Sequence, residues 1–154
     1  MVWKPRVTVA AIACRDDRFL LVEETVNGRL VLNQPAGHLE QGESLLEAVV
    51  REAREESASR FTPESLVGVY HWTFSRANRT TLRFAYAGQC TAHDPEQALD
   101  AGITRTVWLT RDQIAADPAR LRSSLVLRCV DDYLSGARYP LGLVRYLPAI
   151  DTTP

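Results

Sequence analysis

Cysteine is scarce in this chain, and its few copies match no recognised framework. The 154 residues contain three cysteines, Cys14, Cys90 and Cys129, which are odd in number and far apart. Small secreted domains carry paired cysteines, and structural zinc sites carry closely spaced cysteine pairs. We therefore exclude both classes, interpret these residues as buried or incidental thiols, and expect a reducing compartment.

Long apolar runs are absent as well. The N-terminal residues Met-Val-Trp-Lys-Pro-Arg contain no apolar signal core, and no later run approaches the length of a membrane-spanning helix. We therefore expect a cytoplasmic protein with no membrane partner.

Neither sign of charge dominates. Lysine and arginine number 18 against 19 aspartates and glutamates, which gives a formal net charge of -1. Such a balance creates no global field that attracts nucleic acid, so any anion must bind at a local site. The 45% hydrophobic and 24% charged residues are ordinary for a globular protein. We expect one domain over residues 1–154, which is long enough to bury its own core.

An acidic helix is the most informative feature that the sequence does contain. From Ser44 onward the chain has helix-forming residues without proline or glycine. Leu46, Val49, Val50 and Ala53 recur at helical spacing, which predicts one face that packs against a sheet.

Three glutamates of this helix, Glu52, Glu55 and Glu56, are expected together on the adjacent face, because residues three and four apart are neighbours on a helix. Their mutual repulsion would be removed by a hard divalent cation, and Mg²⁺ or Mn²⁺ prefers such oxygen ligands. The alternative is a solvated face on which Arg51 and Arg54 pair with the glutamates at helical spacing.

The extended motif around these glutamates resembles the Nudix box of the Nudix hydrolases. Its matching residues are Gly37, Glu43, Arg51, Glu52, Glu55 and Glu56. The box covers residues 37–59, and it departs from the family pattern where the usual glycine and aliphatic residue are replaced by Ala58 and Ser59. Alanine resists the left-handed conformation that commonly ends a helix. The sequence therefore does not predict how the C-terminus of this helix is capped.

The resemblance implies particular roles for these residues. It implies metal binding by Glu52 and Glu56, with Glu55 as a further ligand or as the base that activates water. The carbonyl of Gly37 would join the metal ligands, and Glu43 would pair with Arg51 to hold the loop against the helix and keep Glu52 aimed. Without the family, Glu43 would simply stabilise the helix N-terminus.

One more carboxylate is expected from the loop of residues 91–102, as in many Nudix enzymes. Asp100 is the best candidate, because Gly102 and Arg105 occupy places where relatives often carry glutamate. A solvated acidic loop would explain the same residues.

The remainder of the chain predicts strands before and after the acidic helix, and two helices near the end. Strands are expected at residues 7–14, 19–22, 30–32, 66–74, 80–90 and 106–109, with a short helix opened by Thr110 and an amphipathic one at about 123–134. The first two strands should form a hairpin. The order predicts an α/β/α sandwich, in which a mixed sheet lies between the acidic and the C-terminal helix, and the family has this fold.

Two strands carry the candidates for substrate binding. Tyr70, Trp72 and Phe74 alternate on one side of their strand, and we favour a core role for them, although Trp72 at a cleft would stack on a heteroaromatic ring. On the next strand Leu82, Phe84 and Tyr86 are expected to point inward. Candidates to meet substrate phosphate are Arg76, Arg79 and Arg83, for which surface exposure is the alternative.

Beyond the box, the chain resembles the NudJ-type Nudix phosphatases over nearly its whole length. The similar segments are residues 4–9, 22–25, 33–40, 121–123 and 135–141. This resemblance implies a Mg²⁺-dependent enzyme, with Mn²⁺ as a substitute, that removes phosphate from nucleoside di- and triphosphates and from a hydroxymethylpyrimidine pyrophosphate. A dinucleotide pyrophosphatase acting on ADP-ribose-like compounds, or a sensor of phosphorylated ligands without catalysis, are the alternatives. Either a monomer or a homodimer is compatible with the sequence.

Overall fold

The computed structural model describes residues 2–149 of the chain. Its strands are β1 (Arg6–Arg15), β2 (Arg18–Val26), β3 (Arg29–Asn33), β4 (Ala36–His38), β5 (Arg60–Phe74), β6 (Arg79–Thr91) and β7 (Ile103–Thr110), and its α-helices are α1 (Leu45–Ser57), α2 (Arg111–Ala115) and α3 (Leu125–Leu134). Short 3-10 turns lie at Ser75–Ala77, Pro118–Arg120 and Leu141–Leu143. No helix of these residues has the length and apolar character needed to cross a membrane.

Strand β1 is central, as its apolar run predicts, and it pairs with three other strands. It forms the expected hairpin with β2 only at its end, where Cys14 pairs with Phe19 and Arg15 with Arg18. The rest of β1 pairs with β6 in parallel and with β4 antiparallel, whereas β2 pairs with β3 and β7. The two parts of the sheet therefore diverge, and the cleft described below is lined from both.

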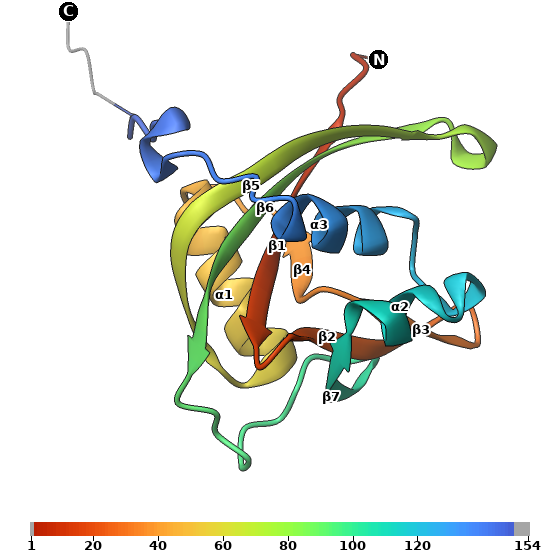
Figure 1. The fold of residues 1–154 in the computed structure, drawn as a ribbon. Helices are drawn as coiled ribbons and strands as arrows, with labels where there is room; N and C mark the ends of the chain where they lie inside the picture. Colours follow the sequence, from red (N-terminus) through yellow and green to blue (C-terminus); the bar gives the residue numbers. More distant parts are fainter. Residues whose placement is uncertain (1, 150–154) are drawn as a thin grey trace, which may run out of the picture.

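The sheet is mixed, with strand order β3-β2-β1-β6-β5, β4 added to β1 and β7 added to β2. Helix α1 lies on one side, and α2 and α3 lie on the other (Figure 1). Each side has its own buried cluster: Val9, Ala11 and Tyr86 pack with α1, whereas Ala10, Ile12 and Ala85 pack with α3. The predicted α/β/α sandwich is confirmed, because period-two alternation along β1 and β6 supplies apolar side chains to both layers.

Strand β5 begins at Arg60, six residues earlier than predicted, and pairs with β6 in a long, curved hairpin (Figure 1). The sequence pattern predicts no strand over residues 60–65, because Pro63 interrupts the alternation. The ladder accommodates this proline by a register shift between Pro63 and Ser65, and a second shift lies between Leu66 and Gly68.

Helix α1 starts where the sequence predicts. Ser44 is its N-cap and forms a capping box, in which the Ser44 hydroxyl accepts from the Glu47 amide and the Glu47 carboxylate accepts from the Ser44 amide. At the other end Ala58 adopts the left-handed conformation, with φ 52° and ψ 29°, and its amide donates to the Arg54 carbonyl. The helix therefore ends with the usual geometry in spite of its missing glycine.

Candidate active site

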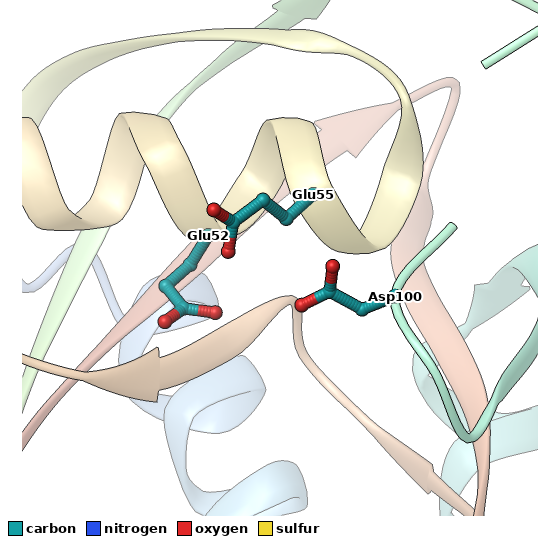
Figure 2. A group of neighbouring side chains, drawn as sticks. All are labelled: Glu52, Glu55 and Asp100. Atoms are coloured by element: carbon teal, nitrogen blue, oxygen red, sulfur yellow. The ribbon is translucent and has the colours of Figure 1, made fainter. Parts of the chain in front are cut away.

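Three carboxylates meet beside helix α1. Glu52 and Glu55 project from the helix, and Asp100 approaches from the loop between β6 and β7 (Figure 2). One oxygen from each lies within 4.8 Å of the other two. The loop is fixed to the helix by the Asp100 amide, which donates to the Glu55 carbonyl at 3.0 Å. The structure thus brings the loop carboxylate predicted from the sequence next to two box glutamates.

Gly37 of β4 lies directly against the carboxylate of Glu52. A Cβ atom at position 37 would stand 2.1 Å from both Cδ and Oε1 of Glu52, which is far inside van der Waals contact. Glycine is therefore required at this position for steric reasons, and its backbone is adjacent to the carboxylate cluster.

Arg51 ties this corner of the site together. Its guanidinium donates to both oxygens of Glu43, at 2.7 and 2.9 Å, and to the His38 carbonyl at 3.0 Å. The paired guanidinium lowers the pKa of the Glu43 carboxyl below its ordinary value. The predicted pair of Glu43 and Arg51 is present, whereas the helix N-terminus is capped by Ser44 and Glu47 instead.

The same guanidinium also contacts the cluster. Nη1 of Arg51 donates to Oε1 of Glu52 at 2.9 Å and to Oε2 of Glu55 at 3.1 Å. The alternative of arginine pairing on the helix face is therefore partly realised. Arg51 engages only one of the two carboxylate oxygens of Glu52 and only one of those of Glu55. Because one guanidinium faces four carboxylates, those of Glu40, Glu43, Glu52 and Glu55, negative charge remains in excess.

Glu56 occupies a different place from the other two box glutamates. It is buried, its Oε2 accepts from the Ala36 amide at 3.0 Å, and it does not belong to the three-carboxylate group. Burial raises the pKa of Glu56 to about 8, and it raises the pKa of Glu52 in spite of the Arg51 contact. Helix rotation predicted one joint face for Glu52, Glu55 and Glu56, but Glu56 points toward the start of β4.

The cluster of Glu52, Glu55 and Asp100 suits a hard divalent cation. All three supply carboxylate oxygens, the donors that Mg²⁺ and Mn²⁺ prefer, and no imidazole or thiolate belongs to the group. A cation would also offset the repulsion that Arg51 leaves uncompensated. The donor set therefore fits a divalent metal that binds phosphate oxygens.

A cleft of about 330 Å³ opens next to this cluster, and Gly37 belongs to its lining. Trp72 and Phe74 of β5 line the cleft, with ring centroids 5.7 Å apart. The preferred core role for these aromatics is therefore wrong for Trp72 and Phe74, and Trp72 reaches the cleft. Tyr70, by contrast, packs against the core on the α3 side. The expected inward positions hold for Tyr86, which is buried, and for Phe84, which packs against the α1-side core.

The three candidate arginines have different environments. Arg83 lines the cleft and is only 9% exposed, and Arg79 lines it near the end of the hairpin. Arg76 lies on the exposed turn beyond β5 and does not line the cleft, so its predicted substrate contact is not supported. The register explains the difference, because Arg79, Thr81 and Arg83 alternate onto the cleft side of β6, whereas Arg76 precedes the strand.

Several cleft residues received no role in the sequence analysis. Thr8, Glu24, Asn33 and His38 line the cleft, from four different strands. Thr8 faces Arg83 in the parallel β1–β6 ladder and His38 in the β1–β4 ladder. Only alternation along β1 could have indicated Thr8, a polar residue in an apolar run. The strand pairing that brings these four residues together cannot be predicted from the local sequence pattern.

An α/β/α sandwich whose acidic helix presents glutamates beside a cleft is the architecture of the Nudix hydrolases. A family model described as the NUDIX domain matches residues 4–128. The chain belongs to the Nudix hydrolase family.

Individual relatives agree with this assignment. The chain is 38% identical to "Phosphatase NudJ" of Escherichia coli K12 over 143 residues, which is 93% of this chain and 92% of the relative. It is 49% identical to a solved Nudix hydrolase from Nitrosomonas europaea, with a TM-score of 0.91 over 94% of this chain and 98% of the other. A MutT Nudix hydrolase from Burkholderia pseudomallei shares the fold, at 19% identity and a TM-score of 0.72 over 84% of this chain and 98% of the other.

Proposed function

We propose that this enzyme is a Mg²⁺-dependent phosphatase of small diphosphate compounds. Its substrates are nucleoside tri- and diphosphates and, as a further candidate, hydroxymethylpyrimidine pyrophosphate, from which it releases phosphate. The observation that carries the proposal is the meeting of Glu52, Glu55 and Asp100 beside the cleft. The 38% identity to a phosphatase over almost the whole chain favours phosphate release over cleavage within a dinucleotide.

The metal-binding roles are assigned to four carboxylates and one backbone carbonyl. We assign Glu52, Glu55 and Asp100 as ligands from the cluster, Glu56 as a ligand after a rotation of its side chain, and the Gly37 carbonyl as a backbone ligand. A bound Mg²⁺ would neutralise phosphate charge and lower the pKa of coordinated water. Mn²⁺, which has the same preference for oxygen, is expected to substitute.

The other residues hold these ligands and the substrate. Arg51 keeps Glu52 and Glu55 in place and is itself oriented by Glu43. Glu55 is the candidate base, because its side chain is 39% exposed and can accept a proton from water. In the cleft, Trp72 offers a face for a heteroaromatic ring and Arg83 a guanidinium for phosphate.

The test is a panel of nucleoside di- and triphosphates, hydroxymethylpyrimidine pyrophosphate and ADP-ribose, assayed with and without Mg²⁺ for phosphate, pyrophosphate and nucleoside monophosphates. Mg²⁺-stimulated release of orthophosphate is expected. Two monophosphates from ADP-ribose at a higher rate would instead identify a dinucleotide pyrophosphatase. Absence of turnover across the panel would favour a sensor of phosphorylated ligands.

Variants of the glutamates test the residue roles. Glu52→Gln and Glu56→Gln should each lower turnover by about two orders of magnitude or more with an unchanged circular dichroism spectrum, because each removes charge at the metal and little packing. Loss of folding would contradict the assignment. A Glu55→Gln variant with full turnover would remove Glu55 from catalysis.

The proposal also covers the localisation, partners, domain organisation and oligomeric state of the enzyme. We propose that the enzyme works in the cytoplasm, with small-molecule diphosphates and no nucleic acid or membrane as partners. Its three cysteines are free thiols, and Cys90 and Cys129 are buried, which suits a reducing compartment. One domain over 1–154 and a monomeric or homodimeric state complete the proposal, and light scattering would decide between the two states.

A further inference from the structure

The guanidinium of Arg83 lines the cleft, and among residues 2–149 it has no counter-ion. The side chain is 9% exposed, and its Nε and Nη1 atoms are buried without a hydrogen-bond partner. Burial lowers the pKa of this guanidinium, yet arginine remains charged in proteins. A buried cation without a partner is unfavourable for folding, so its presence in the cleft calls for an anion from elsewhere.

Two acidic residues of this region, Glu24 and Asp132, form ion pairs with arginines other than Arg83. Oε1 of Glu24, on the same cleft, lies 3.3 Å from Nε of Arg122. Asp132, on α3, accepts from the Tyr70 hydroxyl at 2.8 Å and from Arg128 at 3.0 and 3.1 Å. Among residues 2–149 no carboxylate forms an ion pair with Arg83. The described part of the chain therefore supplies no carboxylate that pairs with this guanidinium.

Other groups around Arg83 are also unpaired or positive. Thr8 is the register partner of Arg83 on β1. Among the described residues, the buried Thr8 hydroxyl and the buried side-chain oxygen of Asn33 have no hydrogen-bond partner. Both residues line the cleft and are less than 10% exposed. Arg6 and Arg79 line the same cleft and add positive charge to it. An anion with several oxygens and a proton to donate matches these groups better than an apolar ring.

We propose that the floor formed by Arg83, Thr8 and Asn33 is a phosphate subsite separate from the carboxylate cluster. This inference rests on the proposed function. It adds that preferred substrates carry one phosphate in addition to the two that are joined by the bond that is cut. The extra phosphate has two chemical sources. It is either the one phosphate of a triphosphate that the cut bond does not join, or a phosphate on the far side of the substrate, such as the 3′-phosphate of a nucleotide.

The decisive experiment compares three substrates in the Mg²⁺-loaded enzyme: ADP, ATP, and ADP that bears a 3′-phosphate. At least one of the two additional phosphates should raise kcat/KM about ten- to a hundredfold over ADP, the value of hydrogen bonds to a charged group. A higher kcat/KM for ATP identifies the triphosphate chain as the source of the extra phosphate, and a higher kcat/KM for the 3′-phosphate compound identifies the far side of the substrate. An enzyme that treats all three alike overturns the proposal.

Variants show whether Arg83 produces the preference. Arg83→Met, which keeps the length of the side chain without its charge, should reduce the advantage to about twofold or less, whereas Arg83→Lys should retain part of it. Arg76→Met is the matched control, because it removes an arginine that does not line the cleft. A preference that survives in Arg83→Met would contradict the proposal.

A binding measurement separates this proposal from failure of the proposed catalytic function. In the metal-free protein, inorganic phosphate should raise the Tm of the wild type and of Arg76→Met, but not of Arg83→Met. Without phosphate, Arg83→Met should have an unchanged or higher Tm, because a buried unpaired charge is removed. If Arg83→Met instead unfolds at a lower temperature and phosphate protects it as well as the wild type, Arg83 is structural and the subsite does not exist.

Discussion

Gly37 and Glu52 form the closest steric fit of the active site. The backbone of β4 passes so near the Glu52 carboxylate that any side chain at position 37 overlaps it. In the same corner Arg51 holds Glu52, Glu55 and Glu43. The addition of a single carbon atom at position 37 would therefore change the orientation of Glu52, the proposed metal ligand.

Gly37→Ala is predicted to displace the Glu52 carboxylate. The added Cβ would stand 2.1 Å from Oε1, so either the carboxylate or β4 must move. We expect turnover to fall by about a hundredfold or more, because small misplacements of catalytic groups have such effects. Steady-state kinetics measures this change.

Gly28→Ala provides a control, because it changes a glycine with open space around it and away from the site. It should lower stability through its positive φ but leave kcat unchanged. Full activity of Gly37→Ala would show that the contact with Glu52 is unimportant.

Glu56 gives the metal-free protein a pH-dependent stability. Its pKa is raised by burial from 4.5 to about 8, so the folded state favours the protonated form. The stabilisation from this group is complete below pH 4.5 and is lost as pH rises toward 8. The Tm in the presence of a chelator should fall over this range, and Glu56→Gln should reduce the slope.

Part of the slope should remain in Glu56→Gln, because burial raises the pKa of Glu52 in the same direction. Glu64→Gln, at an exposed position of β5, is the control and should follow the wild type. An unaltered slope in Glu56→Gln would show that Glu56 is not buried as described.

At the scale of elements, helix α1 positions the ligands and its two ends are fixed by different means. The N-terminus has the capping box of Ser44 and Glu47, and the Ala58 conformation closes the C-terminus. An alanine with positive φ costs about 1–2 kcal/mol relative to its usual conformations. The conformation that ends the last turn, which carries Glu55 and Glu56, therefore lowers the stability of the folded protein.

Ala58→Gly is predicted to stabilise the protein by about 0.5–1 kcal/mol, because glycine adopts the left-handed conformation freely. Urea unfolding measures the difference. Ala53→Gly in the middle of the same helix should do the opposite, by about 1 kcal/mol or more, since it loses helix propensity and buried surface. A less stable Ala58→Gly variant would mean that the packing of the buried Ala58 methyl group exceeds the strain.

At the scale of the whole molecule, an ion cluster links strands β2 and β7 to the 3-10 turn Pro118–Arg120. Glu23 of β2 is 2% exposed on its side chain and pairs with Arg105 of β7 and with Arg120 of the 3-10 turn before α3. Hydrogen bonding from Arg105 holds the pKa of the Glu23 carboxyl below its usual value. Three segments that are distant in sequence depend on this one carboxylate.

Glu23→Gln is predicted to lower the free energy of unfolding at pH 7 by about 2–3 kcal/mol, through loss of charge-assisted hydrogen bonds. Because the folded pKa is lowered, the contribution of Glu23 is complete above pH 4.5 and is lost as pH falls through the folded value. Urea unfolding at pH 7 and pH 3 should therefore show a smaller acid effect in the variant. If the wild type and Glu23→Gln lose equal stability on acidification, the cluster does not act as described.

Much of the fold and part of the site follow from the sequence alone. Alternation and apolar runs predict the strands, and Ser44 followed by Glu47 marks the start of α1, because these signals act between residues close in the chain. The spacing of Gly37, Glu43, Arg51 and the glutamates identified the family, since all lie within one loop and helix. Local chemistry determined these features.

Tertiary structure decided what depends on pairing between distant segments. The register of β1 with β6 places Thr8 beside Arg83, and the loop after β6 brings Asp100 to Glu52. Similarly, the turn of Glu56 toward β4 and the opening of the cleft to Trp72 depend on neighbouring strands. A single sequence fixes which residues are polar but not which polar residues become neighbours, because a shift of one residue in strand pairing would exchange the faces of a sheet.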